Sequence, residues 1–339
     1  MAATGERRTT LLNLEAALTP YSTQVDAELR KYLAPPREPK ELYESAKHLF
    51  DAGGKRLRPI LSLLAAQAVG GDSSEVLPYA AAIEMVHVFS LVHDDIMDKA
   101  ETRRGVPAVH VKFGQSTAIL TGDLLQAMAF ETLCRLNSPP ELTREIVRDF
   151  ASLVKEICEG QQLDLRFESL KRIDELTYFH MVERKTATLY EIAMKHGALI
   201  AKGDVVHSKK LAEAGRLIGL AFQVWDDVLD LTGDSTKTGK PTMEDVFSGK
   251  KTLVTVFAMD KLDPLDRRKL IDLLAKKPKT DEDVRAIMAL YEKAGAIKAA
   301  REKAKAFTSH AKSALASLPP TNARTLISEI ADYAVTREK

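Results

Sequence analysis

The chain has 339 residues, of which 45% are hydrophobic and 29% are charged, a composition typical of soluble globular proteins. Lys and Arg total 49 and Asp and Glu total 48, so no charge excess favours binding to nucleic acid or to an anionic membrane surface. Cys134 and Cys158 form neither a disulfide framework nor a zinc spacing. We interpret them as core or half-buried thiols in a reducing compartment.

The N-terminal residues, MAATGERRTT, lack the apolar stretch of a signal peptide. The sequence shows no run of about 18 uncharged apolar residues, the length that a membrane-spanning helix needs. We therefore expect a cytoplasmic protein without a membrane span.

Apolar residues recur at spacings of three and four over most of the chain, a pattern that predicts helices. The predicted helices are 11–33, 57–70, 75–98, 114–136, 141–166, 175–200, 208–231, 251–260, 265–275, 281–293 and 296–316. Ser74 and Asp174, each followed by a glutamate, are predicted helix starts, and Gly70-Gly71, Pro139-Pro140 and Gly203 are predicted stops.

One stretch, VPAVHVKFG at 106–114, alternates with period two and contains Pro107, which predicts a loop with a short extended segment. Helices and strands do not alternate as they would in a parallel α/β fold, and no stretch has the composition of a flexible linker. The sequence therefore predicts one all-α domain, a helical bundle over residues 1–339.

Two aspartate clusters interrupt otherwise apolar helices, in LVHDDIMDKAETRRG and in FQVWDDVLDLTGD. They comprise Asp94, Asp95 and Asp98, and Asp226, Asp227 and Asp230. The first and third members of each cluster are four residues apart and share a helix face. Carboxylates about 5 Å apart repel each other by roughly 3 kcal/mol at an effective dielectric constant of 20. Magnesium, which prefers carboxylate oxygen and phosphate ligands, would compensate this repulsion.

A single cluster of this kind is more often a solvated acidic helix end. Two clusters, each at the end of an apolar helix and each followed by basic residues, favour metal binding. The basic residues belong to DAGGKRLRP, TRRG, VERKTATL, TGKP and SGKKTL. Basic groups beside metal-binding carboxylates indicate a site for diphosphates, and the two basic sets suggest two diphosphates. The apolar helices suit a hydrocarbon tail and a carbocation, which they would not quench.

These motifs resemble those of the trans-type isoprenyl diphosphate synthases, closest to the archaeal-type short-chain geranylgeranyl diphosphate synthases. The matching motifs are GGKRLRP, EMVHVFSLVHDDIMDKAETRRG, GDLL, GQQLD, ERKTATL, FQVWDDVLD, GKP and GKKT, in that order over residues 53–253. The resemblance implies an isoprenoid synthase fold with a central apolar cavity, a homodimer, and Mg²⁺ as cofactor, with three ions per active site.

The resemblance also implies the reaction, in which isopentenyl diphosphate attacks the cation formed when an allylic diphosphate ionises. Loss of a proton then gives a product five carbons longer. The six aspartates would hold the metals, with Asp95 and Asp227 the weakest assignments. The implied contacts to isopentenyl diphosphate are Lys55, Arg58, His87 and Arg104. The implied contacts to the allylic diphosphate are Arg103, Lys185, Lys240 and Lys250, with Lys185, Thr186 and Gln223 catalytic.

His87 alone would equally be a core histidine, but it lies seven residues before Asp94 on the same helix face. The sequence departs from the family's pattern after GKP, where Met243 stands at a position that usually holds a flexible glycine. We expect this residue to change how the loop moves without abolishing activity.

Product length is expected to depend on side chains just before the first cluster, namely Val86, Phe89 and Ser90. An aromatic five residues before the cluster, with a small residue after it, resembles geranylgeranyl synthases and predicts a C20 product limited by Phe89. A farnesyl diphosphate synthase is the alternative. Rival readings are a terpene cyclase, a non-catalytic partner subunit and a metal-buffering bundle; the intact second cluster and the Lys55/Arg58 pair argue against them.

Overall fold

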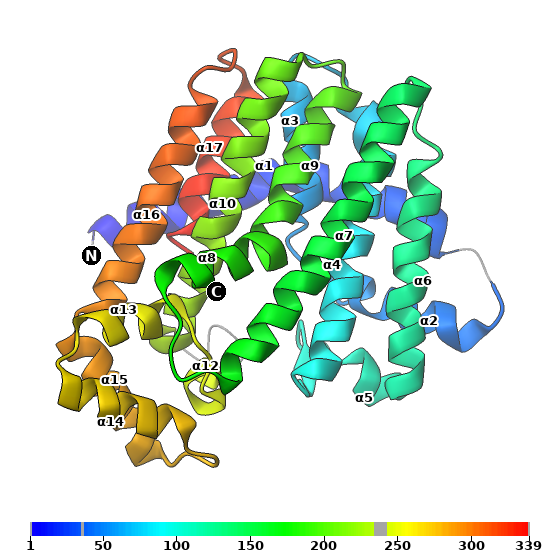
Figure 1. The fold of residues 1–339 in the computed structure, drawn as a ribbon. Coiled ribbons are helices and arrows are strands. Elements are labelled where there is room, and N and C mark those ends of the chain that lie inside the picture. The colour runs from blue at the N-terminus through cyan, green and yellow to red at the C-terminus, as the bar shows by residue number, and fades with distance from the viewer. Residues whose placement is uncertain (1, 35–36, 234–242, 338–339) are drawn as a thin grey trace. The chain divides into compact units, whose positions relative to one another are not determined.

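The computed structural model describes residues 2–34, 37–233 and 243–337, and within them the chain is almost entirely helical (Figure 1). In the first half the elements are α1 (Ala2–Leu33), α2 (Lys40–Asp51), α3 (Leu57–Ala68), a 3₁₀ turn (Ser73–Val76), α4 (Leu77–Met97), β1 (Thr102–Arg103), β2 (Val106–Pro107), α5 (Val109–Phe113), α6 (Gln115–Leu133) and α7 (Pro140–Ser169). The remaining elements are α8 (Glu175–Val182), a π turn (Glu183–Ala187), α9 (Thr188–Ile200), α10 (Val205–Thr232), α12 (Glu244–Ser248), α13 (Leu253–Lys261), α14 (Pro264–Ala275), α15 (Asp281–Lys293), α16 (Ala296–Leu315) and α17 (Asn322–Ala334).

The chain divides into two compact units. The first unit comprises Met1–Val154, Leu189–Gly215 and Ala314–Ile330. The second comprises Lys155–Thr188, Arg216–Ser313 and Ala331–Lys339. The first aspartate cluster belongs to the first unit and the second cluster to the second. A single domain over residues 1–339 stays a prediction.

Helix α4 forms the centre of the first unit. Twelve of its residues are buried, among them Ile83, Val86 and Phe89, and it packs against α3 and α6. By length and composition alone, the stretch Ser73–Met97 could cross a membrane, although its charged residues leave no run of 18 uncharged apolar residues. About two thirds of its apolar window is buried inside the protein, however, as in the core helix of a soluble protein.

The second unit has its own apolar core. Val224 and Val228 of α10 pack in one cluster with Leu253 and Val256 of α13 and with Met181 of α8. This cluster fixes the last turns of α10, which carry the second set of aspartates. The C-terminal end of α10 is therefore held rigidly by apolar packing, and its aspartates extend from this packed part of the helix.

Most predicted helices are confirmed with small shifts of their ends, but α1 begins nine residues earlier than predicted and the predicted helix 175–200 is interrupted by the π turn between α8 and α9. The structure also contains four helices that the periodicity did not reveal. These are α2, α5, α12 and α17. The stretch 106–114 is predicted to be a loop with a short extended segment. The extended segment is confirmed as β2, which pairs antiparallel with β1, but the rest of the stretch forms the short helix α5. Two- and five-residue elements are too short to show a periodicity.

Two further expectations need correction. The 3₁₀ turn before α4 is capped by Asp72, whose carboxylate accepts the backbone N–H of Ser74; the cap is not Ser74 itself. Asp174 does cap its helix, by accepting the backbone N–H of Thr177. Cys134 and Cys158 are both exposed and are not core residues. Cys134 follows the C-terminal end of α6, and Cys158 lies on an exposed face of α7.

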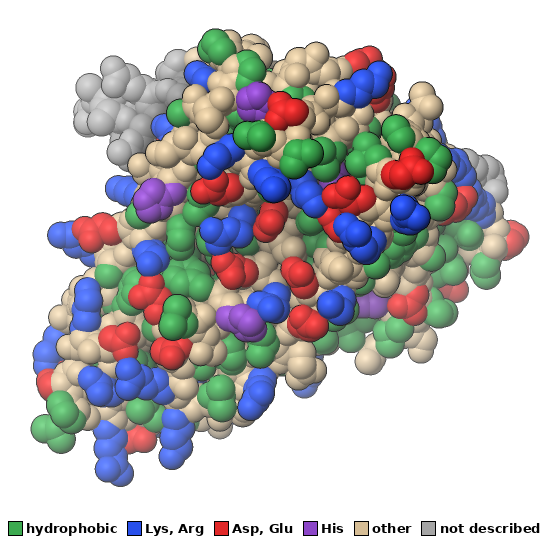
Figure 2. Space-filling model, turned by 45° about the horizontal axis from the view of Figure 1, so that its top comes forward, with side chains coloured by type: hydrophobic (Ala, Val, Ile, Leu, Met, Phe, Trp, Pro, Cys, Tyr) green, Lys and Arg blue, Asp and Glu red, His purple; other side chains and the backbone are tan. Residues whose placement is uncertain are grey.

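Charges of the two signs are interspersed on the surface. Figure 2 shows Lys and Arg side chains alternating with Asp and Glu over the face that it presents, with apolar side chains between them. This distribution agrees with the net charge of +1. Charged groups on this face therefore act through local pairs rather than through one large field.

Candidate active site

The first aspartate cluster lies at the C-terminal end of α4. The backbone N–H of Asp98 donates to the carbonyl of Asp94 at 2.8 Å, so the two residues are one helical turn apart, as the sequence predicts. Asp98 is exposed and Asp94 half-buried, whereas Asp95 is fully buried. The outer two carboxylates are thus available to a cation, and the middle one is not.

Asp95 is paired with an arginine of the β hairpin. Its Oδ1 accepts hydrogen bonds from Nε of Arg103, at 2.8 Å, and from Nη2 of the same residue. Burial raises the pKa of Asp95, and the Arg103 hydrogen bond and charge only partly offset this. Arg103, predicted to contact a diphosphate, therefore also ties the hairpin to the aspartate helix.

A group of arginines gathers around the turn that precedes α3. Arg104, held at φ 54° just after β1, donates from Nη1 to the carbonyls of Leu49 and Gly53 at 2.8 and 2.6 Å. A Cβ on Gly54 would lie 2.9 Å from the Arg104 guanidinium carbon and 3.0 Å from Nη1 of Arg56. Gly54 thus allows two guanidinium groups to pack closely against the backbone, where a Cβ would collide with them.

Arg56 itself is structural. It is buried and bonds to Asp26 at 2.8 Å and to Glu84 at 3.0 Å. Its neighbour Arg58 behaves differently: its guanidinium stacks over the ring of Tyr190 at 4.5 Å, and its buried Nε has no hydrogen-bond partner among the described residues. A buried N–H without an acceptor is costly. Arg58 is therefore positioned to bind an anion.

His87 lies next to Arg58, with Nη1 of the arginine 3.2 Å from its Nε2. Burial, followed by the charges of Arg58, Arg104 and other arginines, lowers the pKa of His87 well below its ordinary value. The imidazole is neutral at pH 7 and can share its hydrogen bonds with an incoming anion. Of the predicted isopentenyl diphosphate contacts, the structure brings Arg58 and His87 together; Lys55 lies exposed on the same turn, three residues before Arg58.

The predicted chain-length residues lie on α4, one to two turns before Asp94. Val86 is fully buried, and Phe89 is 4% exposed with its ring edge against the imidazole of His93, 5.7 Å between centroids. Ser90 is half-buried and donates to the carbonyl of His87 at 2.8 Å. The two larger residues are core side chains of the first unit.

The second aspartate cluster lies near the C-terminal end of α10, and its middle member is again buried. Asp227 accepts hydrogen bonds from the Tyr178 hydroxyl at 2.6 Å, from the Leu253 backbone N–H at 3.1 Å and from Nε2 of Gln223 at 3.1 Å. Burial and repulsion from Asp245 raise the pKa of Asp227 to about 7. Asp227 thus joins α10 to α8 and to the start of α13.

Asp230 caps the short helix α12. Its carboxylate oxygens accept the backbone N–H groups of Glu244 and Asp245, each at 3.1 Å, and its carbonyl accepts the N–H of Met243 at 2.8 Å. Met243 has φ 67° and ψ 23°, the left-handed conformation that glycine adopts without cost. The departure from the family's pattern therefore falls on a position whose backbone geometry suits a glycine.

Lys185 and Thr186 lie on the π turn between α8 and α9, a local widening that is common at functional sites. Gly160 of α7 makes room for it, because a Cβ there would lie only 2.4 Å from the Lys185 nitrogen. The Thr186 hydroxyl donates to Oε1 of Gln223 at 3.0 Å. The structure thus brings the three predicted catalytic residues onto adjoining turns of the second unit.

Two predicted diphosphate-binding lysines share one carboxylate. Nζ of Lys185 is 2.7 Å from Oδ2 of Asp164, and Nζ of Lys250 is 3.5 Å from the same atom. Burial disfavours ionisation of Asp164, but Lys250 and Lys185 outweigh it and lower its pKa. The third predicted lysine of this group, Lys240, lies outside the described residues.

Asp164, Tyr178 and Arg337 are site residues that the sequence analysis did not assign. Asp164 is the last residue of the quoted GQQLD motif, so its signal was present. Arg337 bonds to Asp226 at 2.7 Å from 111 residues away in the sequence, and Tyr178 bonds to Asp227 from 49 residues away. Contacts of such separation leave no local pattern.

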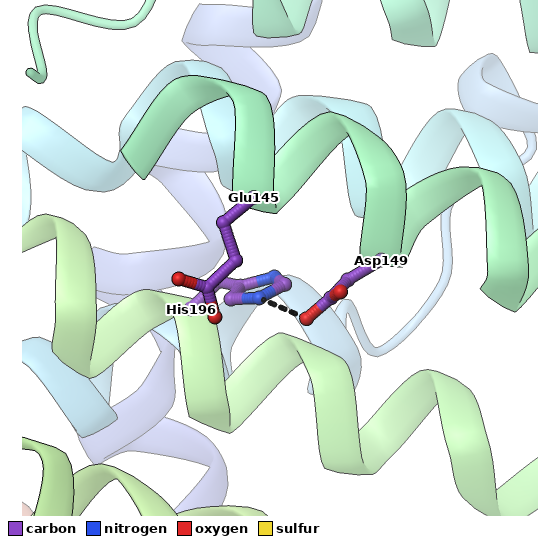
Figure 3. A group of neighbouring side chains, drawn as sticks. All are labelled: Glu145, Asp149 and His196. Carbon is purple, nitrogen blue, oxygen red and sulfur yellow. Dashed lines mark hydrogen bonds and ion pairs between the residues drawn. The ribbon is translucent and has the colours of Figure 1, made fainter. Parts of the chain in front are cut away.

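The four outer aspartates fit magnesium by donor type, because each cluster offers carboxylates one turn apart on a helix end. A different group, Glu145 and Asp149 of α7 with His196 of α9, also has three ligand atoms within 4.8 Å of one another (Figure 3). There, however, Nζ of Lys195 lies 2.6 Å from Oδ2 of Asp149 and 3.5 Å from Glu145. An ammonium group already supplies the positive charge, so this network is structural.

Residues 39–291 match the family model described as polyprenyl synthetase. The chain is 40% identical over 328 residues to the geranylgeranyl diphosphate synthase of Methanosarcina mazei, covering 97% of this chain and 99% of that protein. It is 37% identical over 341 residues to the geranylfarnesyl diphosphate synthase of Natronomonas pharaonis, covering 96% and 98%. The crystal structure of geranylgeranyl pyrophosphate synthetase from Pyrococcus horikoshii superposes with a TM-score of 0.92 at 39% identity, over 97% of this chain and 99% of the other.

These similarities extend over nearly the full length of each protein, and they confirm the resemblance and the all-α fold inferred from the motifs. Both aspartate clusters and the GGKRLRP turn lie inside the matched region. The chain therefore belongs to the polyprenyl synthetase family and is a prenyltransferase.

Proposed function

We propose that the protein is a Mg²⁺-dependent geranylgeranyl diphosphate synthase. It adds isopentenyl diphosphate to dimethylallyl, geranyl and farnesyl diphosphates and releases diphosphate at each step. The observation that carries this proposal is the full-length similarity to the Methanosarcina mazei enzyme together with two intact aspartate clusters. We further propose a cytoplasmic enzyme that acts as a homodimer.

Asp94, Asp98, Asp226 and Asp230 are the proposed metal ligands, because their carboxylates lie at the half-buried or exposed ends of two helices. When bound, three magnesium ions would neutralise the leaving diphosphate as Lewis acids. The buried middle aspartates have another role. Asp95 orients Arg103, and Asp227 orients Gln223 and the start of α13.

The proposed binding site for isopentenyl diphosphate is formed by the side chains of Lys55, Arg58, His87 and Arg104. The Nε–H of Arg58 has no acceptor among the residues that the structure describes. A diphosphate would supply that acceptor and would also raise the pKa of His87, since its charge opposes that of the surrounding arginines. Binding and orientation of this homoallylic substrate rest on these four side chains.

The allylic diphosphate is proposed to bind to Lys185, Lys250, Lys240 and Arg103. Asp164 pairs with Lys185 and Lys250 and so holds these two lysines near each other. Thr186 and Gln223 form a hydrogen-bonded pair beside Lys185, where the hydroxyl and amide dipoles would face the reacting carbons. Ionisation of the allylic carbon–oxygen bond is favoured because these cations stabilise the negative charge of the departing diphosphate.

Phe89 is the proposed limit to product length, with Val86 one turn earlier on α4 and Ser90 beside it. A Phe ring fills far more space than a Ser or Ala side chain, so it would end a cavity that runs along the helix. The relatives include both geranylgeranyl and geranylfarnesyl synthases, so product length varies within this set of similar proteins.

The homodimer is proposed from the surface of α5 and α6. Val111, Ile119 and Leu120 are 52%, 43% and 56% exposed, which is unusual for aliphatic residues on neighbouring helices. A second copy of the chain would bury them. Light scattering of the wild type and of Leu120→Glu tests this: we expect a dimer that the charge dissociates, and a monomeric wild type would contradict it.

The activity is tested with purified protein, Mg²⁺ and isopentenyl diphosphate, incubated separately with C5, C10 and C15 allylic diphosphates. We expect one dominant C20 alcohol after dephosphorylation in all three reactions. Accumulation of C15 would identify a farnesyl diphosphate synthase, and C25 a geranylfarnesyl synthase. No elongation would contradict the proposal and favour a non-catalytic partner subunit.

A further inference from the structure

The last described residue of the chain, Arg337, lies against the second aspartate cluster. Its Nη2 donates to Oδ1 of Asp226 at 2.7 Å and to the carbonyl of Phe222 at 3.0 Å. The guanidinium carbon is 3.5 Å from the centre of the Phe222 ring. The indole N–H of Trp225 donates to the Arg337 carbonyl at 3.1 Å, so one turn of α10 binds both the side chain and the backbone of this residue.

The two partners differ in exposure. The Arg337 side chain is 5% exposed, whereas that of Asp226 is 45% exposed. A buried guanidinium needs a negative partner, and Asp226 is the carboxylate with which Arg337 forms an ion pair in the described part of the chain. The arginine thus neutralises Asp226 from the protein side, while solvent reaches the carboxylate from the other side.

A magnesium ion on Asp226 would place a second cation on a carboxylate that already binds one. Solvent cannot screen Arg337 from that ion, because the guanidinium is buried. Loss of the ion pair would also leave Arg337 attached to α10 only through Phe222 and the Trp225 hydrogen bond, among the contacts of the described residues. The docked arginine and the bound metal therefore compete for Asp226.

We infer that Arg337 is an internal counter-ion of the second aspartate cluster, and that Mg²⁺ binding displaces it and releases residues 335–337 from α10. The inference rests on the proposed role of Asp226 as a metal ligand. It predicts a cost to metal binding, because only the fraction of molecules with Arg337 undocked is competent. If about one molecule in ten is undocked, removing the arginine lowers the half-saturating Mg²⁺ concentration about tenfold.

The chain carries its own reporter, because Trp225 is the single tryptophan of the sequence and contacts Arg337 directly. The full-length wild type and Arg337→Gln are titrated with Mg²⁺ in the presence of inorganic diphosphate, and tryptophan emission is recorded. Hydrogen exchange of residues 331–337 is measured by mass spectrometry without and with Mg²⁺, which tests the wild type even if the variant folds poorly. Titration calorimetry measures Mg²⁺ binding independently.

Lys312→Ala is the matched control. It removes an exposed ion pair with Asp332, at 2.7 Å, which also ties down the C-terminal segment but does not involve Asp226. Its half-saturating Mg²⁺ concentration should equal that of the wild type. For the wild type we expect Mg²⁺ to speed hydrogen exchange at residues 331–337 and to shift tryptophan emission to the red. For Arg337→Gln we expect the emission to be shifted already without Mg²⁺, and the half-saturating Mg²⁺ concentration to be roughly tenfold lower.

Two results would overturn the inference and leave the proposed function intact, provided that calorimetry shows Mg²⁺ binding. The first is unchanged hydrogen exchange at residues 331–337, and the second is an equal half-saturating Mg²⁺ concentration in the wild type and Arg337→Gln. A lower half-saturation in Lys312→Ala would also overturn it, because any loosening of the segment would then suffice. Absence of Mg²⁺ binding heat in every variant would refute the metal role of the cluster, and this inference with it.

Discussion

Gly160 offers a sharp test of how the catalytic π turn is held. A Cβ at this position would lie 2.4 Å from the Lys185 nitrogen, 2.7 Å from its Cα and 2.9 Å from the Arg184 carbonyl carbon. All three atoms are backbone, so no side-chain rotation relieves the overlap. Carbon needs about 3.5 Å from such atoms, and Gly160→Ala must therefore move the π turn by about 1 Å.

The displaced residues are Lys185 and Thr186. A misplacement of about 1 Å at a reacting centre costs on the order of 100-fold in rate, and overpacking costs roughly 1–3 kcal/mol of stability. We expect Gly160→Ala to lower kcat/KM about 100-fold per folded molecule. The assay is steady-state incorporation of isopentenyl diphosphate, with the folded fraction measured by denaturant unfolding.

Gly71→Ala is the matched control, because its Cβ would lie at the same distance, 2.4 Å, from a backbone atom, the Ala201 carbonyl oxygen. Gly71 follows the C-terminal end of α3, at the opposite end of that helix from Arg58. We expect a similar loss of stability with near wild-type kcat/KM. Equal losses of kcat/KM in the two variants, or none in Gly160→Ala, would refute the reasoning.

Three further predictions concern single residues. Phe89→Ser should extend the products beyond those of the wild type, measured by chromatography of the dephosphorylated alcohols; an unchanged profile counts against Phe89 as the limit. Met243→Gly should leave the free energy of unfolding within about 0.5 kcal/mol, whereas Met243→Val should lower it by roughly 1–2 kcal/mol, since the left-handed backbone strains a branched side chain. Hydrogen bonds from His196 and Lys195 hold the pKa of Asp149 below its ordinary value, against an opposing effect of burial. The ionised Asp149 carboxylate stabilises the folded protein above about pH 4, and this stabilisation is lost as the pH falls toward the lowered pKa. Asp149→Asn should therefore lower the free energy of unfolding by roughly 1.5–3 kcal/mol at pH 7 and by less at pH 3, as measured in unfolding titrations.

The sequence predicted the helices and the aspartate clusters because both are local patterns. Spacings of three and four residues identified α4 and α10, and the i, i+4 aspartates at their ends followed from helix geometry. Elements too short for a period, such as α5 and the β hairpin, could not be identified in this way. The role of Gly160 could not be predicted from the sequence either. No side chain fits at this position because the backbone of a different helical segment, at Lys185, lies so close.

The clusters were attributed to metal binding because their charges need compensation, and the structure shows how much of that compensation the chain itself provides. Arg103 neutralises Asp95, and Arg337 neutralises Asp226. Backbone N–H groups of α12 bond to Asp230. These donors offset part of the repulsion among the crowded carboxylates.

The same donors determine which carboxylates can exchange an internal partner for a metal ion. A carboxylate that already has an internal partner gains less from a metal than an unpaired one, since the existing hydrogen bond is lost on exchange. Asp95 and Asp227, which are buried themselves, would lose most by giving up their partners and should therefore keep them. Asp226 and Asp230 are half-buried, so a metal can reach them, and their partners belong to segments that follow α10 in sequence. We therefore expect metal binding at the second cluster to rearrange the C-terminal residues and the start of α12, and we expect Asp95 and Asp227 to keep their present partners.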